Sequence, residues 1–172
     1  MAARPVPRAR RRRRVGRRGR VSSQCTSLIK ITLPPNLTEI GASAFSACAF
    51  LREIMLPPDL TEIGNSAFHW CTSLVDVALP PNLTEIGHAT FYGCTSLSKV
   101  TLPPNLTEIG ARAFCKCTSL REIVLPPHLT ELGEAAFQQC TSLGVIVLPD
   151  GPVDVGACAF YSCPGTPRRP SE

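Results

Sequence analysis

The sequence has no apolar run that approaches the length of a membrane helix, which needs about 20 consecutive apolar residues. Its basic start is not followed by the apolar stretch of a secretory signal. We therefore expect no membrane span and no export, and an intracellular location, cytoplasmic or nuclear, is favoured. Aromatic residues make up only 6% of the chain, and none lies in the first 24 residues, which excludes base stacking there.

Acidic residues are also missing from residues 1–24, which contain ten arginines. Residues 25–163 carry six basic and twelve acidic residues, so the repeat region has a net charge of −6. Charges packed as densely as those of Arg10–Arg14 repel one another, and the segment has little apolar surface to bury. Residues 1–24 are therefore predicted to be a disordered, arginine-rich tail, and residues 164–172 a disordered C-terminal tail.

The composition of the N-terminal tail is compatible with several roles. A basic cluster is typical of a nuclear-import address or of a nucleic-acid contact, and an acid-free, arginine-rich start also suits an organelle transit peptide. An unstructured extension has the same composition. Any nucleic-acid binding is expected through residues 1–24 only, and it would be lost at moderate salt because it is electrostatic.

The dominant feature of the sequence is a unit of 23 residues that recurs about six times, most clearly as CTSLREIVLPPHLTELGEAAFQQ at residues 117–139. Three residue types mark this interval: cysteine at Cys25, Cys48, Cys71, Cys94, Cys117, Cys140 and Cys163; phenylalanine at Phe45, Phe68, Phe91, Phe114, Phe137 and Phe160; and glycine at Gly41, Gly64, Gly87, Gly110, Gly133 and Gly156. A fixed period in this range predicts a solenoid, because one unit cannot bury its apolar side chains without a neighbour. Equivalent residues of neighbouring coils are then expected about 4.8 Å apart.

Within one unit, the apolar residues at the first, fourth and sixth positions of 120–125 predict a short strand. The Pro126–Pro127 pair ends it, because proline has no N–H to donate to a ladder. The Leu-Thr-Glu-Ile-Gly that follows predicts a second short extended segment, and its glycine suits a sharp bend or a positive φ. The spacing of Ala113, Phe114 and Cys117 predicts one face of a short helical turn.

The pattern LxxIxLPxxLTxIGxxAFxxC, which these units share from Cys25 to Cys163, resembles the BspA-type leucine-rich repeat family. The resemblance implies an α/β repeat fold: a right-handed leucine-rich-repeat solenoid with a parallel β-sheet on one face and short turns or helical segments on the other. Members of this family are often microbial cell-surface proteins that bind host or matrix proteins. A surface role for this chain would require an export signal that the sequence does not show.

The outward positions of the predicted sheet vary between units, whereas the core positions do not. We predict that a protein partner binds there, and the combination of arginine with an exposed apolar side chain is typical of interface anchors. The candidate partner-binding face consists of Lys30, Arg52, Glu53, Met55, Asp76, Lys99, Arg121, Glu122 and Val124. The final unit is degenerate and is compatible with a cap, whereas the first unit has no obvious polar cap before Cys25. An uncapped end would expose apolar columns and favour end-to-end self-association.

A column of acids also follows the period, at Glu39, Glu62, Glu85, Glu108, Glu131 and Asp154. We interpret it as a solvated polar edge, with a cation, a basic partner or the arginine tail as alternative ligands. The sequons at Asn36, Asn82 and Asn105 share their slot with Asp59 and His128, which favours a turn preference over glycosylation. Seven of the nine cysteines follow the period, which favours buried, reduced thiols.

The sequence predicts no catalytic, cofactor or metal site. His69, His88 and His128 occupy three different slots of the repeat, so the period does not bring them together. Cys115 and Cys158 do not give the paired spacing of a structural zinc site. We therefore expect a non-enzymatic, protein-binding scaffold. A nuclear or nucleic-acid-associated adaptor that uses the arginine tail, and a surface adhesin, remain the two alternatives.

Overall fold

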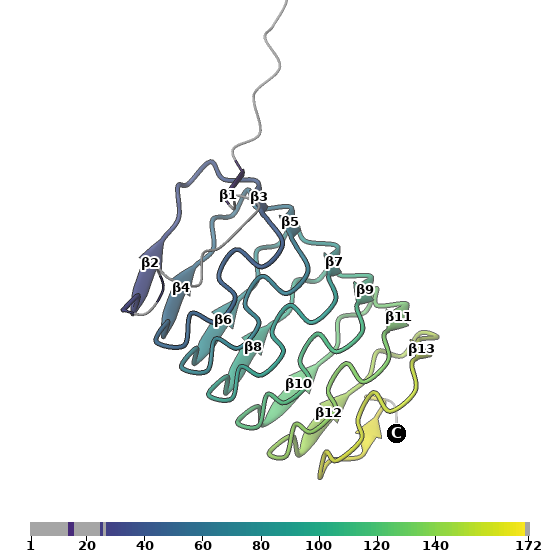
Figure 1. Ribbon diagram of the computed structural model, residues 1–172. Coiled ribbons are helices and arrows are strands. Elements are labelled where there is room, and N and C mark those ends of the chain that lie inside the picture. The colour runs from purple at the N-terminus through teal and green to yellow at the C-terminus, as the bar shows by residue number, and fades with distance from the viewer. Residues whose placement is uncertain (1–13, 16–24, 26, 171–172) are drawn as a thin grey trace, which may run out of the picture.

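The computed structural model describes residues 14–15, 25 and 27–170. Successive 23-residue units form coils that stack along one axis into a β-solenoid of about six turns, as the sequence predicted (Figure 1). Residues 1–24, which were predicted to be disordered, lie outside the described residues except for Arg14 and Val15. Within the described residues there is no helix that could cross a membrane.

Each coil contributes one strand to each of two columns. The main column holds the strands with three residues, together with a two-residue strand at its C-terminal end: β2 (Lys30–Thr32), β4 (Glu53–Met55), β6 (Asp76–Ala78), β8 (Lys99–Thr101), β10 (Glu122–Val124), β12 (Val145–Val147) and β14 (Pro167–Arg168). The short column holds β1 (Arg14–Val15), β3 (Glu39–Ile40), β5 (Glu62–Ile63), β7 (Glu85–Ile86), β9 (Glu108–Ile109), β11 (Glu131–Leu132) and β13 (Asp154–Val155). Every described pairing is parallel, and equivalent residues of successive coils pair in register, for example Val77 with Val100.

The interior of the solenoid consists of ladders of identical side chains. Leu74, Leu97, Phe91 and Cys94 are all 0% exposed, so the middle coils have the dry core that the repeat predicted. Neighbouring phenylalanine rings stack nearly parallel, with centroids 5.1 to 5.6 Å apart. This stacking fits the coil spacing, because offset aromatic pairs prefer centroid separations of about 4.5–7 Å.

The third side of each coil consists of turns, and the prediction of helical segments there is wrong for the described residues. In a representative coil, the N–H groups of Ser43, Phe45 and Ala47 donate to carbonyls of the next coil, at 2.7 to 2.9 Å, while the intervening N–H groups close local turns. Ser43 and Ala47 both have positive φ, and later coils repeat this pattern. A single helical turn would bond internally and is marginal alone, whereas this arrangement hydrogen-bonds each coil to the next.

The glycine column is explained by close approach between coils rather than by backbone conformation. Its members after Gly41 have no positive φ, so that part of the prediction is wrong for Gly64 and its later equivalents. A Cβ on Gly64 would lie 2.5 Å from the Ala42 nitrogen and 2.9 Å from its Cα. Side chains are therefore excluded where the backbones of adjacent coils touch.

The C-terminal segment continues the fold. Residues 164–170, predicted as part of a disordered tail, instead carry β14, which pairs with β12. Nη1 of Arg169 donates to the carbonyls of Pro149, Asp150 and Gly151, at 2.7 to 3.0 Å. This arginine thereby satisfies three carbonyls that follow β12, which the proline-rich sequence did not indicate.

The cysteine column is buried from Cys25 to Cys140 and partly buried at Cys163, but it is not uniformly reduced. Cys25 and Cys48, whose Cα atoms are 4.8 Å apart, form a disulfide, so the expectation of reduced thiols is wrong for this pair. The Sγ atoms of Cys71, Cys94 and their later equivalents instead lie 3.1 to 3.2 Å from phenylalanine carbonyls in the preceding coil. For Cys48 the equivalent carbonyl would belong to residue 22, which lies outside the described residues.

Candidate functional site

The outward face of the main column brings the predicted binding residues together. All nine of the candidate residues are exposed, on or directly before β2, β4, β6, β8 and β10. Because side chains alternate across a strand, Lys30 and Thr32 face solvent while Ile31 between them packs on the core. The same alternation recurs in β4, β6 and β10, whose central residues are buried.

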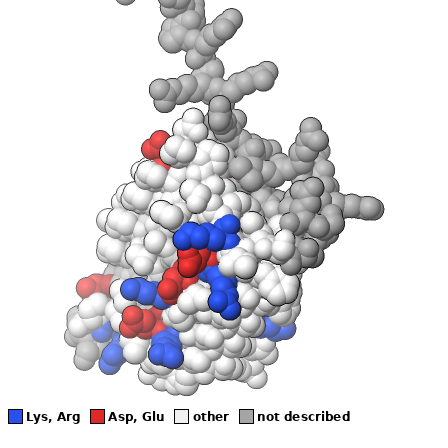
Figure 2. Space-filling model, turned by 90° about the vertical axis from the view of Figure 1, so that its left-hand side faces the viewer, with Lys and Arg blue, Asp and Glu red and all other residues white. Residues whose placement is uncertain are grey.

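This face mixes apolar side chains with charges of both signs. Met55 and Val124 are 64% and 61% exposed, and they occupy the same slot three coils apart. Nζ of Lys30 lies 2.6 Å from a carboxylate oxygen of Glu53, and this hydrogen bond lowers the pKa of Glu53. Figure 2, which views the molecule from the left-hand side of Figure 1, shows basic and acidic side chains interspersed in one area.

The turn side carries an aromatic cluster that the sequence analysis did not find. The ring centroids of His69 and Tyr92 are 5.0 Å apart in a stacked arrangement, and Trp70 meets Tyr92 edge-on at 5.6 Å. Nζ of Lys116 lies 5.4 Å from the Tyr92 ring centroid and 5.9 Å from that of Trp70. Trp70 packs over Gly93, where a Cβ would lie 2.7 Å from the indole. Since residues 70, 93 and 116 share one slot in three successive coils, the cluster ties these coils together.

The acid column lies along the short column of strands, as the period predicted. Wherever these short strands are paired, the acids of neighbouring coils lie in register: Glu39 with Glu62, Glu85 with Glu108, and Glu108 with Glu131. Burial, and then repulsion from Glu85 and Glu131, raise the pKa of Glu108. The column is therefore a row of carboxylates that attracts positive charge.

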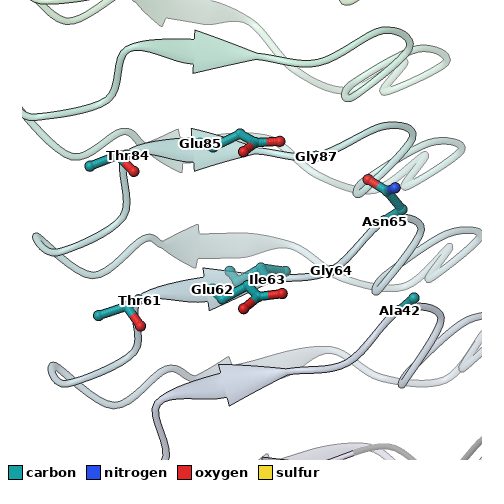
Figure 3. A pocket seen from close by; sticks show the side chains of 9 residues that line it. All are labelled: Ala42, Thr61, Glu62, Ile63, Gly64, Asn65, Thr84, Glu85 and Gly87. Carbon is teal, nitrogen blue, oxygen red and sulfur yellow. The ribbon is translucent and has the colours of Figure 1, made fainter.

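A groove of about 340 Å³ opens beside this column where the pairing of the short strands is interrupted. Among the described strands, β5 is the last of one sheet and β7 the first of the next. The Asn65 side chain lies at this break, and its Oδ1 accepts a hydrogen bond from the His88 N–H at 2.8 Å. A Cβ on Gly87 would lie 2.4 Å from the same Oδ1, so a side chain at this position would clash with Asn65. Figure 3 shows the carboxylates of Glu62 and Glu85 along the groove. This lining can accept hydrogen bonds from a positively charged group.

Within the described residues, no group of three or more histidine, cysteine, aspartate or glutamate side chains is arranged to hold a metal ion. Burial raises the pKa of Cys71 to about 12, and it raises the pKa of Cys94 and Cys117 as well. These thiols are protonated at neutral pH, and a thiolate is the form that acts as a nucleophile or metal ligand. The cysteine ladder is accordingly a packing element.

Comparisons with known proteins agree with this architecture. The family model for the BspA-type leucine-rich repeat region matches residues 20–120, with six copies. None of the curated proteins matches the chain. Among solved structures, a leucine-rich repeat protein of T. pallidum is 32% identical with a TM-score of 0.76, over 82% of this chain and 71% of that protein.

A second solved structure, a leucine-rich repeat protein from Bacteroides ovatus, is 25% identical with a TM-score of 0.57, over 84% of this chain and 55% of that one. A third, from Eubacterium ventriosum, is 25% identical with a TM-score of 0.62, over 80% of this chain and 44% of that one. The chain thus spans about half the length of these two proteins. On its repeats, its strand columns and these matches, the chain belongs to the BspA-type leucine-rich repeat family.

Proposed function

We propose that the chain is a non-enzymatic scaffold that binds a protein partner through the outward face of its main column. The observation that carries this proposal is the exposure of Met55, Val75, Val124 and Val145 along the main column, interspersed with arginine, lysine and acidic side chains. Interface cores are enriched in methionine, aromatic residues and arginine, and a polar rim surrounds them.

The charge of the face supports a protein rather than a nucleic acid as its partner. Among the nine candidate residues, Lys30, Arg52, Lys99 and Arg121 are basic and Glu53, Asp76 and Glu122 are acidic, a net charge of +1. Duplex nucleic acid is bound mainly by neutralising a dense row of phosphates, which a nearly balanced face does not do. Nucleic-acid binding through residues 1–24 stays a separate prediction.

The proposal is tested by capture with the immobilised full chain and two quadruple alanine variants. The first variant changes the face at Arg52, Met55, Arg121 and Val124. The control changes four exposed residues away from the main column, namely Asp59, Asn105, His128 and Glu134. We expect a protein retained by the unchanged chain to be lost with the first variant and kept with the control. Equal retention by both variants would place the interface elsewhere.

A further inference from the structure

The repeat itself does not require the aromatic cluster on the turn side. Trp70 and Lys116 occupy the same slot of the repeat, two coils apart. The other described members of this slot are small or polar, namely Ala47, Gly93, Gln139 and Ser162. The coils therefore stack at this slot without an aromatic or a charged side chain, so the solenoid alone does not explain why these residues are present.

Two rings of the cluster form the walls of a site that opens to solvent. The rings of Trp70 and Tyr92 meet edge-on, with 71° between their planes and centroids 5.6 Å apart. His69 stacks on Tyr92 at 5.0 Å and supports that wall. Gly93 makes room for the indole, because a Cβ there would lie 2.7 Å from it. Trp70 is 39% exposed, so a ligand can reach its ring from outside.

The Lys116 ammonium shows what these two rings attract. Its Nζ lies over both of them, 5.4 Å from the Tyr92 centroid and 5.9 Å from the Trp70 centroid. A hydrogen bond to Tyr92 and then the charge interaction with Tyr92 raise the pKa of Lys116, burial lowers it, and Cys115 adds to the rise. No described carboxylate is among these causes, so the rings and not an acid face this charge. Aromatic faces recognise quaternary ammonium groups in the same way.

Lys116 is an occupant that a better-suited cation can replace. A lysine ammonium has three N–H donors and is strongly hydrated, so it regains its hydrogen bonds in water when it leaves the rings. A quaternary ammonium has no N–H group to satisfy and loses nothing of this kind between two rings. Calcium and magnesium are unsuited to the site, because they need several oxygen ligands.

We propose that Trp70 and Tyr92 bind the quaternary ammonium group of a choline-type ligand, and that the Lys116 side chain closes this site until the ligand displaces it. The same group occurs in free choline and in the head group of phosphatidylcholine. The site lies on the turn side, away from the outward face of the main column, so this proposal and the proposed function can fail independently.

Trp70 is the only tryptophan of the chain, so its fluorescence reports on this site in the full-length protein. The unchanged chain and three variants are titrated with tetramethylammonium chloride, with sodium chloride at equal ionic strength as the reference. Lys116→Gln removes the ammonium, and Gln139 occupies the same slot with a similar positive φ. Arg112→Gln removes a positive charge from the same turn and is the matched control. The double variant Lys116→Gln with Tyr92→Gln also removes one wall.

Tetramethylammonium should change the Trp70 fluorescence of the unchanged chain saturably, whereas sodium should not. An exposed cation–π contact is weak, so Lys116→Gln should bind the probe only roughly two- to fivefold more tightly. Arg112→Gln should match the unchanged chain. The double variant should bind roughly two- to fivefold more weakly than Lys116→Gln. Titrations with choline and with phosphatidylcholine vesicles, against phosphatidylglycerol vesicles, distinguish the two sources, and saturation by either supports the site.

The same change with sodium chloride, or no saturable change in either the unchanged chain or Lys116→Gln, would overturn the site. Equal affinities of Lys116→Gln and Arg112→Gln would overturn the closing role of Lys116. If the double variant bound as tightly as Lys116→Gln, Tyr92 would not be a wall. Binding of tetramethylammonium with no response to choline or phosphatidylcholine would overturn the choline-type ligand. Circular dichroism verifies that all four proteins are folded.

Discussion

The glycine column offers a direct test of coil packing, because the same substitution should have opposite effects at two positions. In Gly64→Ala, the new Cβ would lie 2.5 Å from the Ala42 nitrogen and 2.9 Å from the Gly41 carbonyl carbon, so the backbone of the adjacent coil must move. Gly144 lies in another slot, where a Cβ would meet no atom within 4 Å, and its φ is not positive.

Overpacking a tight contact costs about 1–3 kcal/mol, and we expect Gly64→Ala to lie at the upper end because backbone rather than a flexible side chain is struck. Gly144→Ala should instead stabilise the chain by about 0.5 kcal/mol, since it lowers the entropy of the unfolded state without strain. The two variants should thus differ by about 3 kcal/mol in the free energy of unfolding.

Urea unfolding of the full-length proteins, followed by circular dichroism, measures this difference. Similar unfolding midpoints for the two variants, or a neutral Gly64→Ala, would show that the coils do not approach each other as closely as described. A changed slope of unfolding in Gly64→Ala would instead indicate loss of cooperativity between coils, which the midpoint alone does not report.

Three further predictions concern the acid column, the thiols and the phenylalanine ladder. Because the pKa of Glu108 is raised in the folded chain, the contribution of this residue to stability is present at low pH and is lost as the pH rises through the folded pKa. Glu108→Gln should therefore be more stable than the unchanged chain at pH 7, by about 0.5 kcal/mol or less, and equally stable below about pH 4. Unfolding measured across this pH range tests both expectations. A thiol reagent should modify exposed Cys158 quickly, whereas buried Cys117 should react only on unfolding, and mass spectrometry of timed samples would contradict this if both reacted together. The Phe91 ring is 0% exposed between two stacked neighbours, so Phe91→Ala should lower the free energy of unfolding by about 3–5 kcal/mol. Phe50 is 58% exposed, so Phe50→Ala should lower it only slightly in the same urea assay. Equal losses of stability in the two variants would refute the dry phenylalanine ladder.

The sequence predicted the core and the strand columns because a strict period places equivalent residues in neighbouring coils without any knowledge of loop geometry. Leu106 and Ile109 belong to the second extended segment that the repeat predicted, and both are 0% exposed. The period also placed the acids of Glu85 and Glu108 opposite each other in register. These inferences need only the repeat and the alternation of side chains along a strand.

The turn side could not be predicted in the same way. The spacing of Ala113, Phe114 and Cys117 is compatible both with a helical turn and with the observed turns. Arg112 and Lys116 have positive φ, but neither is a glycine, so the sequence gives no sign of this backbone conformation. Bonding between coils decides the outcome, because alternate N–H groups find carbonyls in the next coil. Tertiary hydrogen bonds therefore override the local pattern.

The aromatic cluster and the C-terminal strand were missed for different reasons. Trp70, Gly93 and Lys116 share one slot, so an inspection of that slot across three coils would have revealed the cluster. The role of Arg169 depends on carbonyls about 20 residues earlier in the chain, and a proline-rich segment gives no sign of such contacts.

The claim that the outward face of the main column binds a protein is tested most directly by oxidative footprinting of the chain with and without the partner that it captures. Met55 is 64% exposed on that face, and Trp70 is 39% exposed on the turn side, so the two residues report on different surfaces within one sample. We predict that the partner protects Met55 from oxidation and leaves Trp70 unchanged. Protection of Trp70 with continued oxidation of Met55 would contradict the account.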